Sequence, residues 1–211
     1  MTDQDRPAVP DSALAAEATE LVRAAATPLI YHHSRRVYYF GALRGQRDGL
    51  RFDPEILYVA AMFHDLGLTE RYRRTDQRFE IDGADEARRF LLANGIAEHL
   101  AELAWAGIAL HTTPEIPLHM APEIALVTRG VELDVLGLGY HEIADEQRAA
   151  VVAEHPRPDF KRQILAAFTD GIKGRPGTTF GNVKADVLEH FVPGFQRGDF
   201  VEVIQNSGWP E

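Results

Sequence analysis

The sequence contains no cysteine among its 211 residues. This absence excludes disulfide bonds, thiolate nucleophiles and the cysteine ligands of zinc sites. Any metal ion bound by the chain must therefore be held by histidine and carboxylate side chains. A chain without cysteine also suits the reducing cytoplasm, and we expect a cytoplasmic protein.

Other functional patterns are missing as well. The serines are Ser12, Ser34 and Ser207, and none lies in the Gly-x-Ser-x-Gly motif of α/β-hydrolases. The chain has neither the Gly-x-x-x-x-Gly-Lys nor the Gly-x-Gly-x-x-Gly phosphate-binding pattern. No apolar run approaches the length of about 20 residues that a bilayer requires, and residues 1–10 lack the apolar core of a signal peptide. We therefore expect no membrane association.

Positive charge is scarce, with 22 Lys and Arg against 32 Asp and Glu, which gives a net charge of -10. Binding to nucleic acid or to an anionic membrane would require a basic face, so neither partner is expected. The 45% hydrophobic content and the length suit one soluble globular domain. The sequence favours a small-molecule substrate, and it is compatible with a homo-oligomer.

The apolar residues recur at helical spacing almost throughout, and no alternating strand pattern stands out. The sequence therefore predicts an all-α protein, a single helical bundle with a central metal site. We divide it into an N-terminal segment and helix (1–27), the main domain (28–192) and a C-terminal tail packed on that domain (193–211). The predicted helices cover residues 12–26, 29–44, 54–67, 83–94, 97–112, 122–136, 141–154, 158–172 and 183–191.

Four metal-capable residues lie within apolar helical patterns, namely His33, His64, Asp65 and Asp134. Asp53 and Pro54 are typical of the N-cap and the first position of a helix. In the helix that follows, His64 lies on the same apolar stripe as Leu57. A single inward histidine is usually a hydrogen-bonded core residue. Two inward histidines and two inward aspartates are harder to explain in that way, because buried carboxylates are usually paired or bound to metal.

The order His, His-Asp, Asp resembles the HD-domain superfamily of metal-dependent hydrolases. The closer resemblance is to the cyanamide hydratase branch, and it spans roughly residues 28 to 140. The segments that carry it are HSRRVY at 33–38, FHDLGLT at 63–69, RFEIDGA at 78–84, ALHT at 109–112 and ELDVLG at 132–137.

The resemblance implies a bundle that holds one divalent metal, with His33, His64, Asp65 and Asp134 as ligands. Zn²⁺ suits such a set, and Fe²⁺ or Mn²⁺ suit it too. The implied reaction adds metal-activated water to a small nitrile-type substrate, converting cyanamide to urea. Asp65 would act as general base, His111 would protonate or polarise the nitrogen, and Thr112 would help to orient the substrate.

Two alternatives remain open. An HD-type phosphohydrolase of a nucleotide or phosphomonoester would use the same ligands, with phosphate contacts from Arg71, Arg73, Arg74 and Arg78, although that segment also suits a solvated loop. Many phosphohydrolase members of the superfamily carry a lysine at the position of Leu68, so this chain departs from their pattern. The third alternative is a non-enzymatic binding module. The sequence predicts that Asp82 caps the helix that begins at Gly83. Glu80 either borders the site or has a capping role before Asp82.

Overall fold

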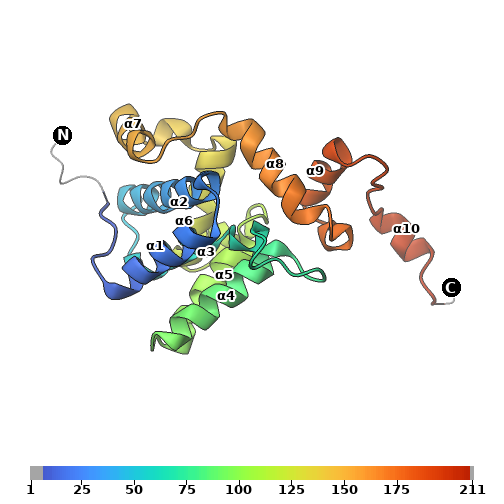
Figure 1. Ribbon diagram of the computed structural model, residues 1–211, viewed down its shortest axis with the longest axis horizontal. Coiled ribbons are helices and arrows are strands. Elements are labelled where there is room, and N and C mark those ends of the chain that lie inside the picture. Colours follow the sequence, from blue (N-terminus) through green and yellow to red (C-terminus); the bar gives the residue numbers. More distant parts are fainter. Residues whose placement is uncertain (1–6, 210–211) are drawn as a thin grey trace.

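A computed structural model describes residues 7–209 of the chain. Within this part the protein is built from ten α-helices and short single-turn helices, without strands, which confirms the predicted all-α bundle (Figure 1). The helices are α1 (Ala13–Ala25), α2 (Pro28–Arg47), α3 (Pro54–Phe63), α4 (Phe79–Ala93), α5 (Glu98–Leu110), α6 (Pro122–Val131), α7 (Asp145–Glu154), α8 (Phe160–Ile172), α9 (Lys184–Phe191) and α10 (Phe200–Gln205). In the described residues, no helix is long and apolar enough to cross a membrane.

Local capping explains where α3 begins. The Asp53 carboxylate accepts hydrogen bonds from the backbone N–H groups of Glu55 and Ile56, at 2.9 and 3.2 Å, and Pro54 occupies the first turn. These contacts satisfy amide groups that have no partner within the helix. The helix then runs to Phe63, so that His64 and Asp65 follow immediately at its carboxyl end.

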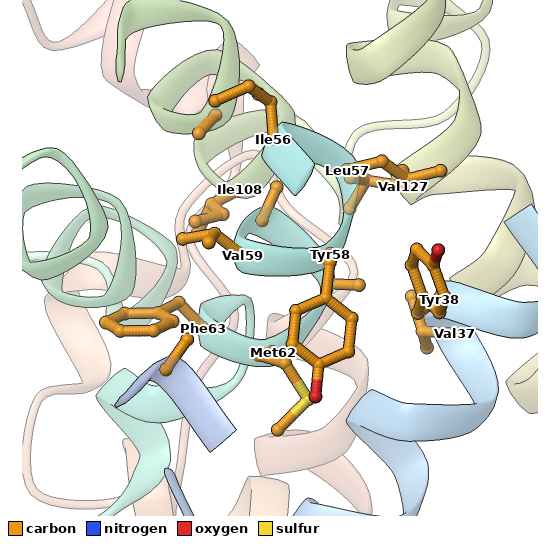
Figure 2. Close-up of a cluster of buried hydrophobic side chains, with 14 of the residues drawn as sticks. Val37, Tyr38, Ile56, Leu57, Tyr58, Val59, Met62, Phe63, Ile108 and Val127 are labelled. Atoms are coloured by element: carbon orange, nitrogen blue, oxygen red, sulfur yellow. The ribbon is translucent and has the colours of Figure 1, made fainter. Parts of the chain in front are cut away.

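Helix α3 forms the centre of the core. Every residue from Ile56 to Phe63 is buried, and the helix contacts α1, α2, α4, α5 and α6. Figure 2 shows Ile108 of α5 and Val127 of α6 beside the side chains of this helix. Because α3 is surrounded by packed side chains, the His-Asp pair at its end is held by the most buried part of the molecule.

Helices α2 and α6 approach each other at two glycines. A Cβ atom at Gly130 would lie closer to the carbonyl oxygen of Val37 than van der Waals contact allows, and one at Gly41 would crowd the carbonyl oxygen of Leu126. The two backbones are therefore in direct contact. This packing fixes α2, which carries His33, against the helix that leads to Asp134.

Helices α8 and α9 lie at one side of the bundle (Figure 1). A second hydrophobic cluster joins them to it. Its buried members are Ile30, Leu68, Phe79, Phe160, Ile164, Ile172 and Leu188. Of the predicted tail, Phe195 packs against this cluster, whereas every residue of α10 is exposed. Helix α10 lies beyond α9 at the C-terminal end of the molecule (Figure 1).

Candidate metal centre

Three of the predicted metal ligands come together in the interior. His33 lies on α2, His64 follows the last residue of α3, and Asp65 precedes the single turn η2 (Leu66–Leu68). One potential ligand atom from each of these residues lies within 4.8 Å of the others, and all three side chains are buried. His111, at the end of α5, completes the lining of the same place.

The three imidazoles are oriented in the same way. Nδ1 of His64 donates to the carbonyl oxygen of Ala61 at 2.7 Å, and Nδ1 of His111 donates to the carbonyl oxygen of Ile108 at 2.6 Å. Nδ1 of His33 lies 2.7 Å from Oδ2 of Asp134, which can only accept when it is ionised. In each neutral ring the lone pair therefore belongs to Nε2, the orientation that metal-binding histidines adopt.

The Asp65 carboxylate lies at the point where these Nε2 atoms meet. Its Oδ2 is 3.3 Å from Nε2 of His64 and 3.6 Å from Nε2 of His33, and its Oδ1 is 3.6 Å from Nε2 of His111. Both carboxylate oxygens and Nε2 of His111 are buried without a hydrogen-bond partner. Leaving several polar atoms unsatisfied in the interior is costly, and a cation bound between them would satisfy them together. The donor set therefore fits a divalent metal ion.

The electrostatics of the group follow from burial and proximity. Burial alone would raise the pKa of the Asp65 carboxyl, but His64 and His111 hold it well below its usual range. Burial lowers the pKa of His33 and so favours the neutral form of its ring. Burial would also lower the pKa of His64, but the Asp65 carboxylate raises it above the ordinary value. The site thus combines a buried anion with neighbouring nitrogen donors.

The fourth predicted ligand, Asp134, lies on the other side of the His33 ring. Its Oδ2 contacts Nδ1 of His33, and its two oxygens accept hydrogen bonds from Arg36, both at 2.8 Å. Asp134 is part of the π-helical turn η4 (Glu132–Leu136), which directly continues α6. In this structure Asp134 therefore orients His33 and does not join the group formed with His64 and Asp65. The contribution of Arg36 was not predicted from the sequence.

Glu80 does not cap a helix. Helix α4 begins at Phe79, and the Glu80 carboxylate accepts hydrogen bonds from Nζ of Lys184 and from the hydroxyl of Thr112. The hydroxyl of Thr112 in turn accepts a hydrogen bond from Nδ2 of Asn182 at 3.1 Å. Glu80 and Lys184 are each only 1% exposed. Lys184 was not predicted from the sequence, because it lies on α9 and meets Glu80 only through the tertiary fold.

A cavity of about 250 Å³ adjoins the metal group, which consists of His33, His64 and Asp65. Its polar lining includes His33, His64, Asp65, His111, Thr112 and Lys184. None of the four arginines considered for phosphate binding lines it. Arg73 donates to the carbonyl oxygen of Leu68 at 2.7 Å, and Arg78 donates to that of Phe180 at 3.0 Å.

The fold and the site define a class of protein, an all-α bundle with a buried cluster of histidine and aspartate that can hold a divalent metal. The model of the HD domain family matches residues 30–163, more than half of the chain, and the protein belongs to the HD domain family. This family generally comprises metal-dependent hydrolases. No curated protein matches the chain at a significant level.

Proposed function

We propose that the protein is a metal-dependent hydratase that adds water to a small nitrile-type substrate, with the conversion of cyanamide to urea as its reference reaction. One observation carries the proposal. The Nε2 atoms of His33, His64 and His111 converge on the unpartnered carboxylate of Asp65 at the wall of a small cavity. The resemblance to the cyanamide hydratase branch supplies the class of substrate.

His33, His64 and Asp65 would hold the metal, and His111 has a free nitrogen beside them. The predicted role of Asp134 as a further ligand stays a prediction, since its oxygens are engaged by His33 and Arg36. We propose Zn²⁺, with Fe²⁺ and Mn²⁺ as alternatives, because each accepts nitrogen and carboxylate ligands. When bound, Zn²⁺ lowers the pKa of its water to about 7.

Proton transfer is assigned to Asp65 and His111. Oδ1 of Asp65 accepts a proton from the attacking water and passes it to Nε2 of His111, which delivers it to the substrate nitrogen. The two atoms are 3.6 Å apart, and catalytic hydrogen bonds commonly tighten only when the substrate is bound. The hydrogen bond from Nδ1 to the carbonyl oxygen of Ile108 keeps the His111 ring in place during this transfer.

Thr112 contributes to the substrate pocket in a restricted way. It lines the cavity beside His111, and its hydroxyl hydrogen is donated to Glu80. In this proposal Thr112 therefore contacts the substrate through its methyl group and its oxygen. The remaining walls are largely apolar and include side chains of α8 and α9. In this proposal these side chains exclude water from the reacting atoms.

A phosphomonoesterase is the second candidate. It is favoured by one observation, the ammonium group of Lys184 at the cavity wall, which could contact a phosphate oxygen. The same ammonium group is already paired with Glu80, so the pair carries no net charge. For this reason the uncharged substrate ranks first.

Urea formation from cyanamide by the purified, metal-loaded protein tests the proposal. We expect activity that a chelator removes and that is lost in Asp65→Ala. The exposed Asp170→Ala variant serves as the matched control and should retain activity. If the metal-loaded protein forms no urea but releases phosphate from a panel of phosphomonoesters, the second candidate replaces the first.

A further inference from the structure

The cavity beside the metal group is much larger than cyanamide and mainly apolar in its walls. Its volume is about 250 Å³, just below the range of roughly 300–1,000 Å³ that is usual for drug-sized ligands. Ile164 and Phe168 of α8 and Val187 of α9 form part of the wall, and Val135 of η4 contributes from another side. A cavity lined in this way favours a ligand with an apolar body.

Lys184 is the cationic residue in this lining. Its ammonium group carries three N–H donors, and in the described part of the chain Glu80 is the hydrogen-bond acceptor that it reaches. The side chain is 1% exposed, so water does not supply the other acceptors freely. The ring of Phe79 lies beside it, with Nζ 5.2 Å from the ring centroid. The ammonium group of Lys184 can therefore donate further hydrogen bonds to a ligand in the cavity.

Lys184 is also connected to the reacting end of the site. Its partner Glu80 accepts the hydroxyl hydrogen of Thr112, and Thr112 directly follows His111. The ring of Phe79 also contacts His111, since the two ring centroids lie 5.6 Å apart. The ammonium group thus belongs to the same compact wall as the histidine that faces Asp65.

We propose that Lys184 is a substrate-binding residue, and that the substrate has an apolar body packed against α8 and α9 and an oxygen acceptor that binds Nζ of Lys184. The acceptor is an uncharged carbonyl oxygen, because the Glu80–Lys184 pair carries no net charge. This inference names the substrate class of the proposed enzyme and therefore rests on the proposed function. Cyanamide has neither an apolar body nor an oxygen atom, so it would be a minimal substrate of a site built for a larger nitrile.

Equilibrium binding of unreactive ligands tests this inference. We would titrate acetate, phenylacetate and phenylacetamide into the full-length, zinc-loaded protein and measure each affinity by calorimetry. Phenylacetate or phenylacetamide should bind at least about tenfold more tightly than acetate, because only these two fill the apolar cavity. The comparison between them tests the uncharged acceptor, which predicts tighter binding of phenylacetamide.

The decisive variant is Glu80→Gln combined with Lys184→Met. The double change avoids leaving one member of a buried ion pair without its partner, which is strongly destabilising. It should weaken binding of the tighter ligand at least about tenfold, whereas Lys173→Met should not, because Lys173 is an exposed residue paired with Asp170. Should the double variant not fold, Val187→Trp, which fills the cavity from a half-buried position, should abolish binding of the aromatic ligands.

Three results would overturn the inference. Acetate could bind as tightly as the aromatic ligands, the double variant could bind them like the unaltered protein, or Val187→Trp could leave their binding unchanged. None of these results depends on urea formation. A binding result that contradicts the role of Lys184 is therefore distinguishable from a failure of the proposed hydratase activity, which the cyanamide assay measures separately.

Discussion

Nε2 of His33 lies 3.1 Å from Nε2 of His64 in the protein interior. The Nδ1 atom of each ring is engaged elsewhere, by Asp134 and by the carbonyl oxygen of Ala61. Two lone pairs that face each other at this distance repel unless a proton or a cation lies between them. A metal ion bound between these two histidines, next to the Asp65 carboxylate, would remove this repulsion.

Metal binding should stabilise the protein. With Zn²⁺ at about 100 times its dissociation constant, the added stability is about 2.7 kcal/mol, which raises the melting temperature by about 5–10 °C in a domain of this size. Calorimetry with Zn²⁺ and with a chelator measures this shift. His64→Ala should abolish it, and exposed His119→Ala should leave it intact. A shift that persists in His64→Ala would place the metal elsewhere.

Asp134→Asn should weaken metal binding without abolishing it. The carboxylate accepts the Nδ1 hydrogen of His33, and loss of such a supporting contact typically costs a factor of about 10–100 in metal affinity. Competition with a chromogenic chelator gives the affinity. Asp170→Asn, which changes an exposed aspartate, is the control. An unchanged affinity in Asp134→Asn would show that the carboxylate does not support His33.

Arg36→Met should be among the most destabilising substitutions in the chain. Arg36 is fully buried, binds both oxygens of Asp134 and donates to the carbonyl oxygens of His155 and Pro156 at 3.1 and 3.0 Å. Breaking a buried pair on one side typically costs about 3–5 kcal/mol. Urea denaturation measures the loss, and the exposed Arg89→Met should change stability by less than about 0.5 kcal/mol. Similar losses for the two variants would contradict this account.

The Glu80–Lys184 pair should make stability depend on pH in the acidic range. Burial alone would raise the pKa of Glu80, but Lys184 lowers it below the ordinary value. A carboxyl with a lowered pKa contributes stability above its unfolded pKa of about 4.3, and loses it as the pH falls through the folded pKa. The stability difference between the unaltered protein and Glu80→Gln should therefore be largest above about pH 5 and shrink below it. Denaturation curves from pH 3 to pH 7 test this, and a constant difference would refute it.

Gly130→Ala should disturb both the fold and the metal site. The added methyl group would overlap with the carbonyl oxygen of Val37 and push α6 away from α2, at a cost of about 1–3 kcal/mol. Metal affinity should fall as well, because His33 and Asp134 depend on this packing. Gly174→Ala is the control, since a Cβ at that position meets no atom within 4 Å. The two variants can be compared by urea denaturation and zinc titration.

Features that depend on neighbours in the sequence were predictable. Asp53 and Pro54 mark the start of α3 in the structure as they do in the sequence, because the cap requires only the next few amide groups. The predicted cap at Asp82 was wrong. Helix α4 begins at Phe79, and the Asp82 carboxylate binds the distant Arg175, so a tertiary ion pair replaces the local cap.

The site shows the same difference between features set by sequence neighbours, which were predictable, and features set by tertiary contacts, which were not. The burial of His33, His64 and Asp65 followed from their places in apolar helical patterns, and the structure brings these residues together. Lys184 could not be found in this way, because an isolated lysine gives no sign of burial until its partner is known. The position of Asp134 beside Arg36 likewise depends on how α2 meets the turn that follows α6.

The metal group and part of the apolar cavity wall belong to different parts of the molecule. His64 and Asp65 follow α3, at the centre of the main core, whereas Ile164, Phe168 and Val187 come from α8 and α9, which pack through the second cluster. Substitutions on α8 and α9 can therefore reshape the pocket while α3 stays in place. A lineage that carries this chain can change the shape of this pocket in small steps while the metal group is inherited unaltered.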